Sequence, residues 1–102
     1  MKRNIKPSFI EVMGNSPINR VLNFLIENDR ESWNMNEISE NAKVGYSTLK
    51  LLIPKLLKYD LIIIHKEIGR IKLYKIGTCL IVKKIRELYN QINKQVLPAL
   101  FG

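Results

Sequence analysis

The sequence contains a single cysteine, Cys79, and a single histidine, His65, among 102 residues. One cysteine cannot form an intramolecular disulfide, and a free thiol suits the reducing cytoplasm. Zinc sites need several Cys or His ligands, so we expect no metal and no cofactor. The chain also lacks a Gly-rich phosphate loop and a nucleophile with a matching base, so we expect no enzymatic activity.

Long apolar runs are missing as well. The longest aliphatic run covers residues 61–64, whereas a membrane-spanning helix needs about 20 apolar residues. Met1-Lys2-Arg3 looks like the start of a signal peptide, but no apolar stretch follows it. We therefore expect a soluble cytoplasmic protein without membrane contact. A hydrophobic content of 46% is enough for one core, and residues 1–102 have room for only one domain.

Acidic residues become scarce after residue 42. Residues 1–42 have a net charge of −1, whereas residues 43–75 carry eight basic and two acidic residues, a net charge of +6. Residues 76–102 add a net charge of +3. A generally basic protein with solvated lysines would also be positive. Concentration of the charge in the middle third favours a polyanionic partner, because phosphate contacts supply most non-specific affinity for DNA.

Apolar residues at helical spacing predict three helices in the first part of the chain. Residues 17–28 form the first, with Ser16 as its N-cap and Pro17 at its first position. After a short extended segment at 33–35, a second helix covers about 36–43, with Asn36 as N-cap. The third helix covers about 46–59. The second and third helices, residues 36–59 with a short turn between them, match a helix-turn-helix unit.

The period then changes to that of strands. Residues 61–67 and 71–76 are rich in β-branched residues, and Gly69 stands between them. This pattern predicts a hairpin over about 61–76. A helix-turn-helix followed by a basic hairpin is typical of a winged helix. The predicted fold is therefore mainly α with a small β-hairpin, an α+β fold with a three-helix core and a wing.

A long C-terminal helix is predicted over about 78–97, ending before Pro98. Apolar residues recur on it in steps of four and three, as in a coiled-coil seam. In so small a domain this helix would leave apolar area exposed, so we expect a homodimer. The interface is expected to contain Phe9, Ile81, Ile85, Leu88, Tyr89, Ile92 and Val96.

In a helix-turn-helix the second helix enters the major groove with its N-terminal residues nearest the bases. Hydroxyl and ammonium groups there can contact base edges or phosphates, although Ser47 and Thr48 can equally serve only to satisfy the helix start. Arginine at the wing suits a narrow minor groove. Pro54 requires a kink or a shorter helix. An exposed Leu51 would contact a thymine methyl or a protein partner. The expected DNA contacts are Lys43, Tyr46, Ser47, Thr48, Lys50, Lys55, Lys66, Arg70 and Lys72.

Several short motifs, taken in order, resemble a group of small archaeal winged-helix transcriptional regulators over roughly residues 7–93. The resemblance implies a winged-helix fold, dimerisation through the last helix, and DNA binding through the third helix and wing. Lys43 and Gly45 depart from the family, which often has Gly and then Ser there, so Gly45 replaces the usual serine cap of the recognition helix. The motifs are Gly14-Asn15-Ser16-Pro17, Arg20-Val21-Leu22, Phe24-Leu25, Glu37-Ile38, Tyr46-Ser47-Thr48-Leu49, Gly69-Arg70 and Lys72-Leu73-Tyr74.

Sequence-specific binding of double-stranded DNA by a homodimeric transcriptional regulator is therefore the leading interpretation. The main alternative is a winged helix used for protein contact within a larger nucleic-acid-processing assembly, because a fold alone does not define a function. Such a module has no need of a +6 segment. RNA binding is disfavoured because only Tyr46, Tyr59 and Tyr74 offer rings for base stacking in the basic segment.

Overall fold

The computed structural model describes residues 4–5, 8–95 and 97–98. Over these residues the fold is a mixture of α and β, with five helices, an antiparallel hairpin and a short pairing of two dipeptides. In chain order the elements are β1 (Asn4–Ile5), α1 (Phe9–Met13), α2 (Pro17–Glu27), α3 (Met35–Ala42), α4 (Tyr46–Lys58), β2 (Ile62–Ile68), β3 (Ile71–Ile76), α5 (Leu80–Lys94) and β4 (Leu97–Pro98).

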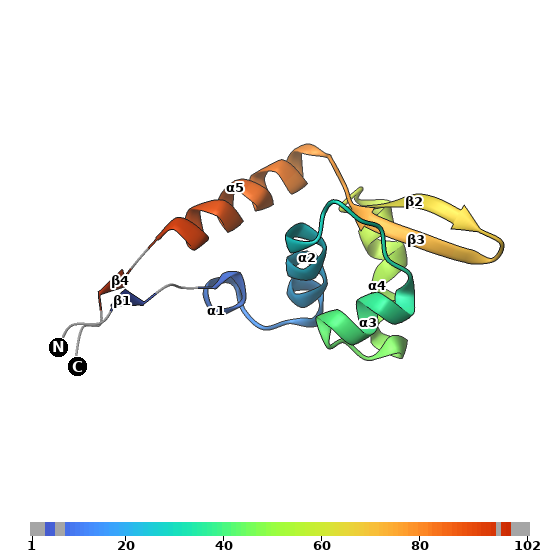
Figure 1. Cartoon of the computed structure of the whole chain (residues 1–102), viewed down its shortest axis with the longest axis horizontal. Coiled ribbons are helices and arrows are strands. Elements are labelled where there is room, and N and C mark those ends of the chain that lie inside the picture. Colours follow the sequence, from blue (N-terminus) through green and yellow to red (C-terminus); the bar gives the residue numbers. More distant parts are fainter. Residues whose placement is uncertain (1–3, 6–7, 96, 99–102) are drawn as a thin grey trace.

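Helices α2, α3 and α4 lie together, and the β2–β3 hairpin projects from them on one side (Figure 1). Helix α5 leads away from the hairpin toward α1, and β1 pairs with β4 beyond them. The core sits where the three helices meet the base of the hairpin and the start of α5. Its most deeply buried side chains are Val21, Leu25, Ile38, Leu49, Leu56, Ile62 and Val82.

The start of α2 confirms the expected cap, whereas the start of α3 corrects one. The Ser16 hydroxyl accepts a bond from the Asn19 backbone N–H at 3.2 Å. At α3 the cap is Asn34, not Asn36. The Asn34 side chain accepts from the Glu37 N–H at 2.9 Å, and Glu37 accepts from the Asn34 N–H at 3.0 Å. Only Asn34 has a glutamate three residues later, so only it can form this reciprocal pair.

Helix α4 continues through Pro54 to Lys58, so the proline does not shorten it. Leu49, Ile53 and Leu56 are buried on its inner side, and Pro54 lies on the exposed side. A proline cannot donate to the carbonyl four residues earlier, which here belongs to Lys50. Because Lys50 is exposed too, water can replace that hydrogen bond.

The hairpin pairs Ile62 with Ile76 at its base and Ile68 with Ile71 at its end. Gly69 opens the connecting turn with φ +62°, a left-handed value that glycine adopts without steric cost. A register shift occurs between Ile64 and Lys66. Trp33 adds an isolated antiparallel bridge to Tyr74, which confirms the expected extended backbone at Trp33, whereas Met35 already belongs to α3.

Helix α5 is shorter than the expected 78–97. It ends at Lys94, and Gln95 is already extended. The predicted seam therefore loses its last turn, and Val96 lies outside the described residues.

Two of the residues expected at a dimer interface are instead buried within the chain. Phe9 and Ile92 are each 4% exposed, and the Phe9 ring lies 6.0 Å from the Tyr89 ring. Helix α1 covers this side of α5, which accounts for the burial. Ile85 and Tyr89 also pack against the core. Of the expected set, Ile81 and Leu88 are the exposed side chains among the described residues, at 54% and 38%.

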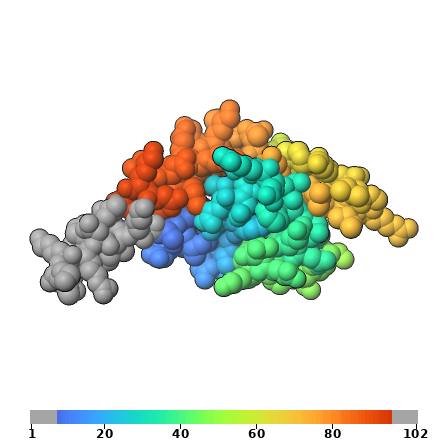
Figure 2. Space-filling model, viewed as in Figure 1, coloured from blue at the N-terminus to red at the C-terminus, as the bar shows by residue number. Residues whose placement is uncertain are grey.

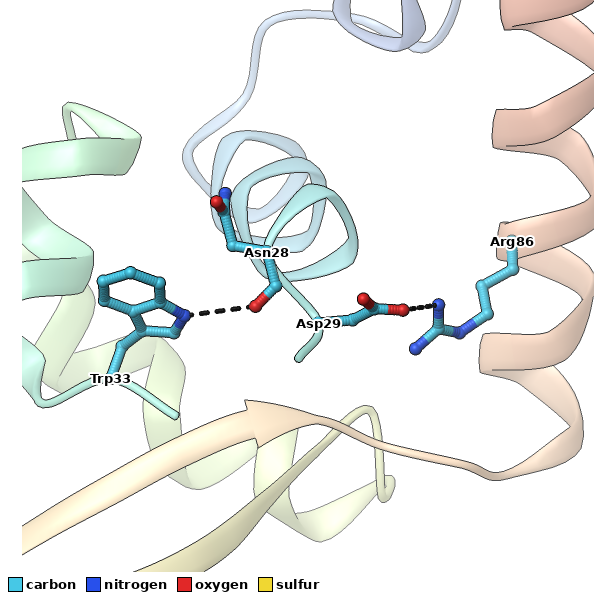
Figure 3. A network of polar contacts seen from close by, with 4 residues as sticks. All are labelled: Asn28, Asp29, Trp33 and Arg86. Carbon is cyan, nitrogen blue, oxygen red and sulfur yellow. Dashed lines mark hydrogen bonds and ion pairs between the residues drawn. The ribbon is translucent and has the colours of Figure 1, made fainter. Parts of the chain in front are cut away.

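Polar contacts join the segment after α2 to α5 and link two residues within that segment (Figure 3). Arg86 of α5 donates to the Asp29 carboxylate at 2.6 Å, and the Trp33 indole donates to the Asn28 carbonyl at 3.3 Å. The hydrogen bond from Arg86 lowers the pKa of Asp29 below its usual value. Asp29 therefore links α5 to the end of α2.

No helix within the described residues has both the length and the apolar character needed to cross a membrane.

Candidate nucleic-acid interface

Most basic residues of the segment 43–75 are exposed, and none of them forms an ion pair within the described residues. Lys75 is half-buried, and the other seven are exposed. Within the part of the chain that the structure describes, the ion pairs are Lys84–Glu87 and Arg86–Asp29, both outside this segment. A net charge of +6 therefore faces solvent over α4 and the hairpin.

The start of α4 leaves polar groups free. Gly45 is the N-cap and supplies no side-chain bond to the helix. The hydroxyls of Ser47 and Thr48 are exposed, and neither forms a hydrogen bond with the described residues. The first N–H groups of a helix without a side-chain cap favour an anion.

A groove of about 370 Å³ lies between the starts of α3 and α4 and the outer part of the hairpin. It brings together three predicted site residues, Tyr46, Arg70 and Lys72. These residues come from elements far apart in the sequence. On the hairpin side the groove is lined by two basic residues, Arg70 and Lys72, together with Ile71 and Tyr74.

Residues 34–36 also line this groove and are absent from the sequence-based prediction. Because Asn34 serves as the cap, the exposed Asn36 side chain is free of that role. Tyr74 closes the groove on the β3 side, and its burial, with smaller effects of Tyr46 and Glu67, raises the pKa of its phenol. Asn36 could have been identified from the sequence as a candidate site residue. Only Asn34 has Glu37 three residues later, so Asn34 is the better cap and Asn36 is left free.

The other expected contacts lie around the groove or away from it. Ser47 and Lys50 follow Tyr46 in the first turns of α4. Lys55 is five residues beyond Lys50, about 140° around the helix, so it belongs to the other flank of α4.

The hairpin lysines point to different faces. Lys66 is directly opposite Leu73 and Lys72 is opposite Glu67, in neighbouring pairs of the hairpin. Neighbouring pairs point to opposite faces, so Lys66 faces away from the Lys72 side.

Leu51 is the most exposed large apolar residue of α4, at 79%. It lies four residues after Ser47, and the two share the solvent face of the helix. A leucine there has no packing role within the chain.

No family model matches the chain, and comparisons with curated proteins and with solved structures find no match either.

Proposed function

We propose that the chain is a winged-helix DNA-binding protein that acts in the cytoplasm as a homodimeric transcriptional regulator. Helix α4 is the recognition helix in the major groove, and the β2–β3 hairpin is the wing on the minor groove or its phosphates. The observation that carries the proposal is the shared groove, which joins Tyr46 at the start of α4 to Arg70 and Lys72 of the hairpin, and neither basic residue forms an ion pair within the described residues.

The order of elements supports this assignment. A short connection of three residues, Lys43 to Gly45, joins α3 to α4, and the hairpin follows α4 directly. In helix-turn-helix proteins this arrangement presents the N-terminal residues of the second helix to base edges. Ser47, Lys50 and Leu51 are the residues that α4 offers there. Serine and lysine can hydrogen-bond, and leucine can contact a thymine methyl.

A binding competition tests the proposal against the RNA alternative. A labelled DNA duplex of about 30 base pairs is challenged with unlabelled duplex DNA, single-stranded DNA and duplex RNA of the same sequence. We expect duplex DNA to compete best. Equal or better competition by RNA would contradict the proposed groove geometry.

Replacement of Lys43 by glycine should stabilise the fold while weakening DNA binding. Lys43 ends α3 with φ 56° and ψ 46°, a left-handed conformation that costs a non-glycine residue about 1 kcal/mol. Glycine removes this cost, so urea unfolding should show a gain of about 1 kcal/mol. If Lys43 contacts a phosphate, affinity for duplex DNA should fall a few-fold. Lys43→Arg is the control, and it should leave both quantities near wild type.

Opposite changes in stability and affinity separate a structural role of Lys43 from a role in DNA binding. A Lys43→Gly protein that is more stable and binds DNA as well as wild type would remove Lys43 from the DNA face.

The homodimer is proposed through the apolar side chains that α1 and α5 leave exposed. Ile81 and Leu88 are seven residues apart on α5, so they share one side of the helix. Val12 and Met13 of the neighbouring α1 are 53% and 45% exposed. A second copy that covers these side chains would remove apolar surface from water in both chains.

Charge introduced on this surface should separate the dimer. Ile81→Glu/Leu88→Glu is expected to sediment as a monomer at tens of micromolar, roughly where a standard interface would keep wild type dimeric. Lys83→Glu/Lys94→Glu introduces two glutamates at other exposed positions of α5 and should stay dimeric. A wild-type monomer at this concentration would refute the interface.

A protein-contact module is the second candidate, favoured specifically by the exposed Leu51. In that case α4 would dock on an apolar protein surface. Leu51→Ser would then abolish partner binding, and the basic residues of the hairpin would be dispensable.

A further inference from the structure

The end of the hairpin carries an exposed apolar pair. Ile68 and Ile71 are the last paired residues before the turn, with 62% and 53% of their surfaces exposed. Directly opposed residues of antiparallel strands share a face, with Cβ atoms about 5 Å apart. The two isoleucines therefore form one continuous apolar patch, which we call the tip patch. Figure 2 shows the hairpin reaching beyond the helices as a narrow arm, so the tip patch does not pack on them.

Basic residues lie next to the tip patch, with Lys66 on the same face of the hairpin and Lys72 on the opposite face. Arg70 lies in the turn between the two isoleucines, and Lys72 and Lys66 follow one and two pairs farther from the turn. Glu67 is the acidic residue of this region. Ile71 also borders the groove that contains Arg70 and Lys72. The tip patch is thus continuous with the basic surface assigned to DNA, and its charge complements a polyanion.

We propose that the tip patch is a wedge that enters the DNA minor groove and kinks the duplex. This inference rests on the proposed DNA-binding function. Arg70 enters the groove, and Ile68 or Ile71 separates the stack at one base step. Minor-groove proteins combine basic residues with apolar wedges in this way, and isoleucine is one of the side chains used.

The wedge would add a form of sequence preference that needs no hydrogen bond to a base. Pyrimidine–purine steps such as TA and CA/TG unstack most easily, so a wedge costs least energy there. The hairpin would therefore select deformable steps at a fixed distance from the bases that α4 reads. Contacts by lysine or arginine alone would give affinity at the hairpin without this preference.

DNA ring closure measures the kink without knowledge of the operator. Fragments of about 150 base pairs, near the persistence length, close slowly under ligase unless a protein bends them. Saturating wild-type protein should accelerate closure by about tenfold, as expected when a kink removes part of the bending energy. Ile68→Thr/Ile71→Thr should return the rate to within about twofold of free DNA, since threonine keeps the β-branched shape but cannot act as an apolar wedge.

The matched control is Ile64→Thr, which changes an isoleucine of the same strand that is 39% exposed and belongs to the pair with Tyr74. It should accelerate closure as wild type does. The double variant should retain the wild-type circular dichroism spectrum and sedimentation, and its affinity by anisotropy should stay within about fivefold of wild type because phosphate contacts dominate affinity.

The outcomes separate the wedge from the function on which it rests. Binding of wild type without faster closure, or equal acceleration by the double variant, overturns the wedge and leaves DNA binding intact. No binding of wild type to duplex DNA at low salt overturns both. A third outcome is that wild type binds phosphatidylcholine vesicles, the double variant does not, and wild type does not accelerate ring closure. That outcome assigns the tip patch to a lipid surface and overturns the wedge.

Discussion

Substitution of alanine for both Lys50 and Arg70 should lower the affinity for duplex DNA by roughly 10- to 100-fold without changing the circular dichroism spectrum. Lys50 lies in the first turns of α4 and Arg70 in the turn of the hairpin, and both are exposed. Neither side chain packs in the core, so the fold should be unaffected. The pair removes one contact from each of the two elements that the proposal assigns to DNA.

The salt dependence gives the same experiment a second readout. Each phosphate contact contributes about 0.9 to the slope of log affinity against log salt concentration. If both residues contact phosphates, the slope should become shallower by nearly two units. If Lys50 contacts a base edge instead, the slope should change by about one unit while affinity still falls.

A charge-matched variant separates local contacts from net charge. Lys83→Ala/Lys94→Ala removes two exposed positive charges from α5, so both variants have the same formal net charge. We expect its affinity to stay within about threefold of wild type, because only long-range attraction is lost. Equal losses in the two variants would mean that total charge, rather than α4 and the hairpin, determines binding.

Gly77→Ala should destabilise the fold by about 3 kcal/mol or more, the largest stability effect that we expect from a single methyl group. Gly77 is buried between the end of β3 and the start of α5, and its N–H donates to the Leu61 carbonyl at 2.8 Å. A Cβ atom at this position would overlap the carbonyl oxygen of Asp60. That oxygen belongs to the backbone, so it cannot move aside as a flexible side chain could.

Equilibrium unfolding in urea measures this effect, with Gly45→Ala as the matched control. A Cβ on Gly45 would have its nearest neighbour, the Thr48 hydroxyl, at 4.0 Å, and the φ of −55° suits any residue. We expect Gly45→Ala to change the free energy of unfolding by less than about 1 kcal/mol. A Gly77→Ala protein as stable as wild type would show that the junction of β3 and α5 relaxes more freely than the Asp60 contact implies.

Helices α2 to α5 and the hairpin could be predicted because each has its own signal in the sequence. Ser16 and Pro17 set the start of α2, and the change from helical to alternating period near residue 61 separates α4 from the hairpin. The ends of helices were harder. Asn34 and Asn36 are equally good caps by residue type, and only the position of Glu37 distinguishes them. The helical pattern of α5 continues to about residue 97, so the pattern alone did not identify Lys94 as its last residue.

Burial by distant elements could not be read from periodicity. The pattern on α5 shows an apolar side but not what covers it, and α1 covers Ile92 with the aid of Phe9. The same reason explains the groove. Its walls come from α3, α4 and β3, so Asn36 becomes a neighbour of Arg70 only after folding. Each basic residue could be predicted as a candidate, but their grouping depends on tertiary packing.

The most direct test of DNA binding is a fluorescence-anisotropy titration of wild-type protein with a random duplex of about 30 base pairs, repeated across a salt series. The proposed interface predicts measurable affinity at low salt and a log–log slope of about −3 or steeper, as expected when several phosphates are contacted. A search for the preferred sequence would follow. Absence of binding at low salt, or binding that salt does not weaken, would contradict the assignment of α4 and the hairpin to DNA.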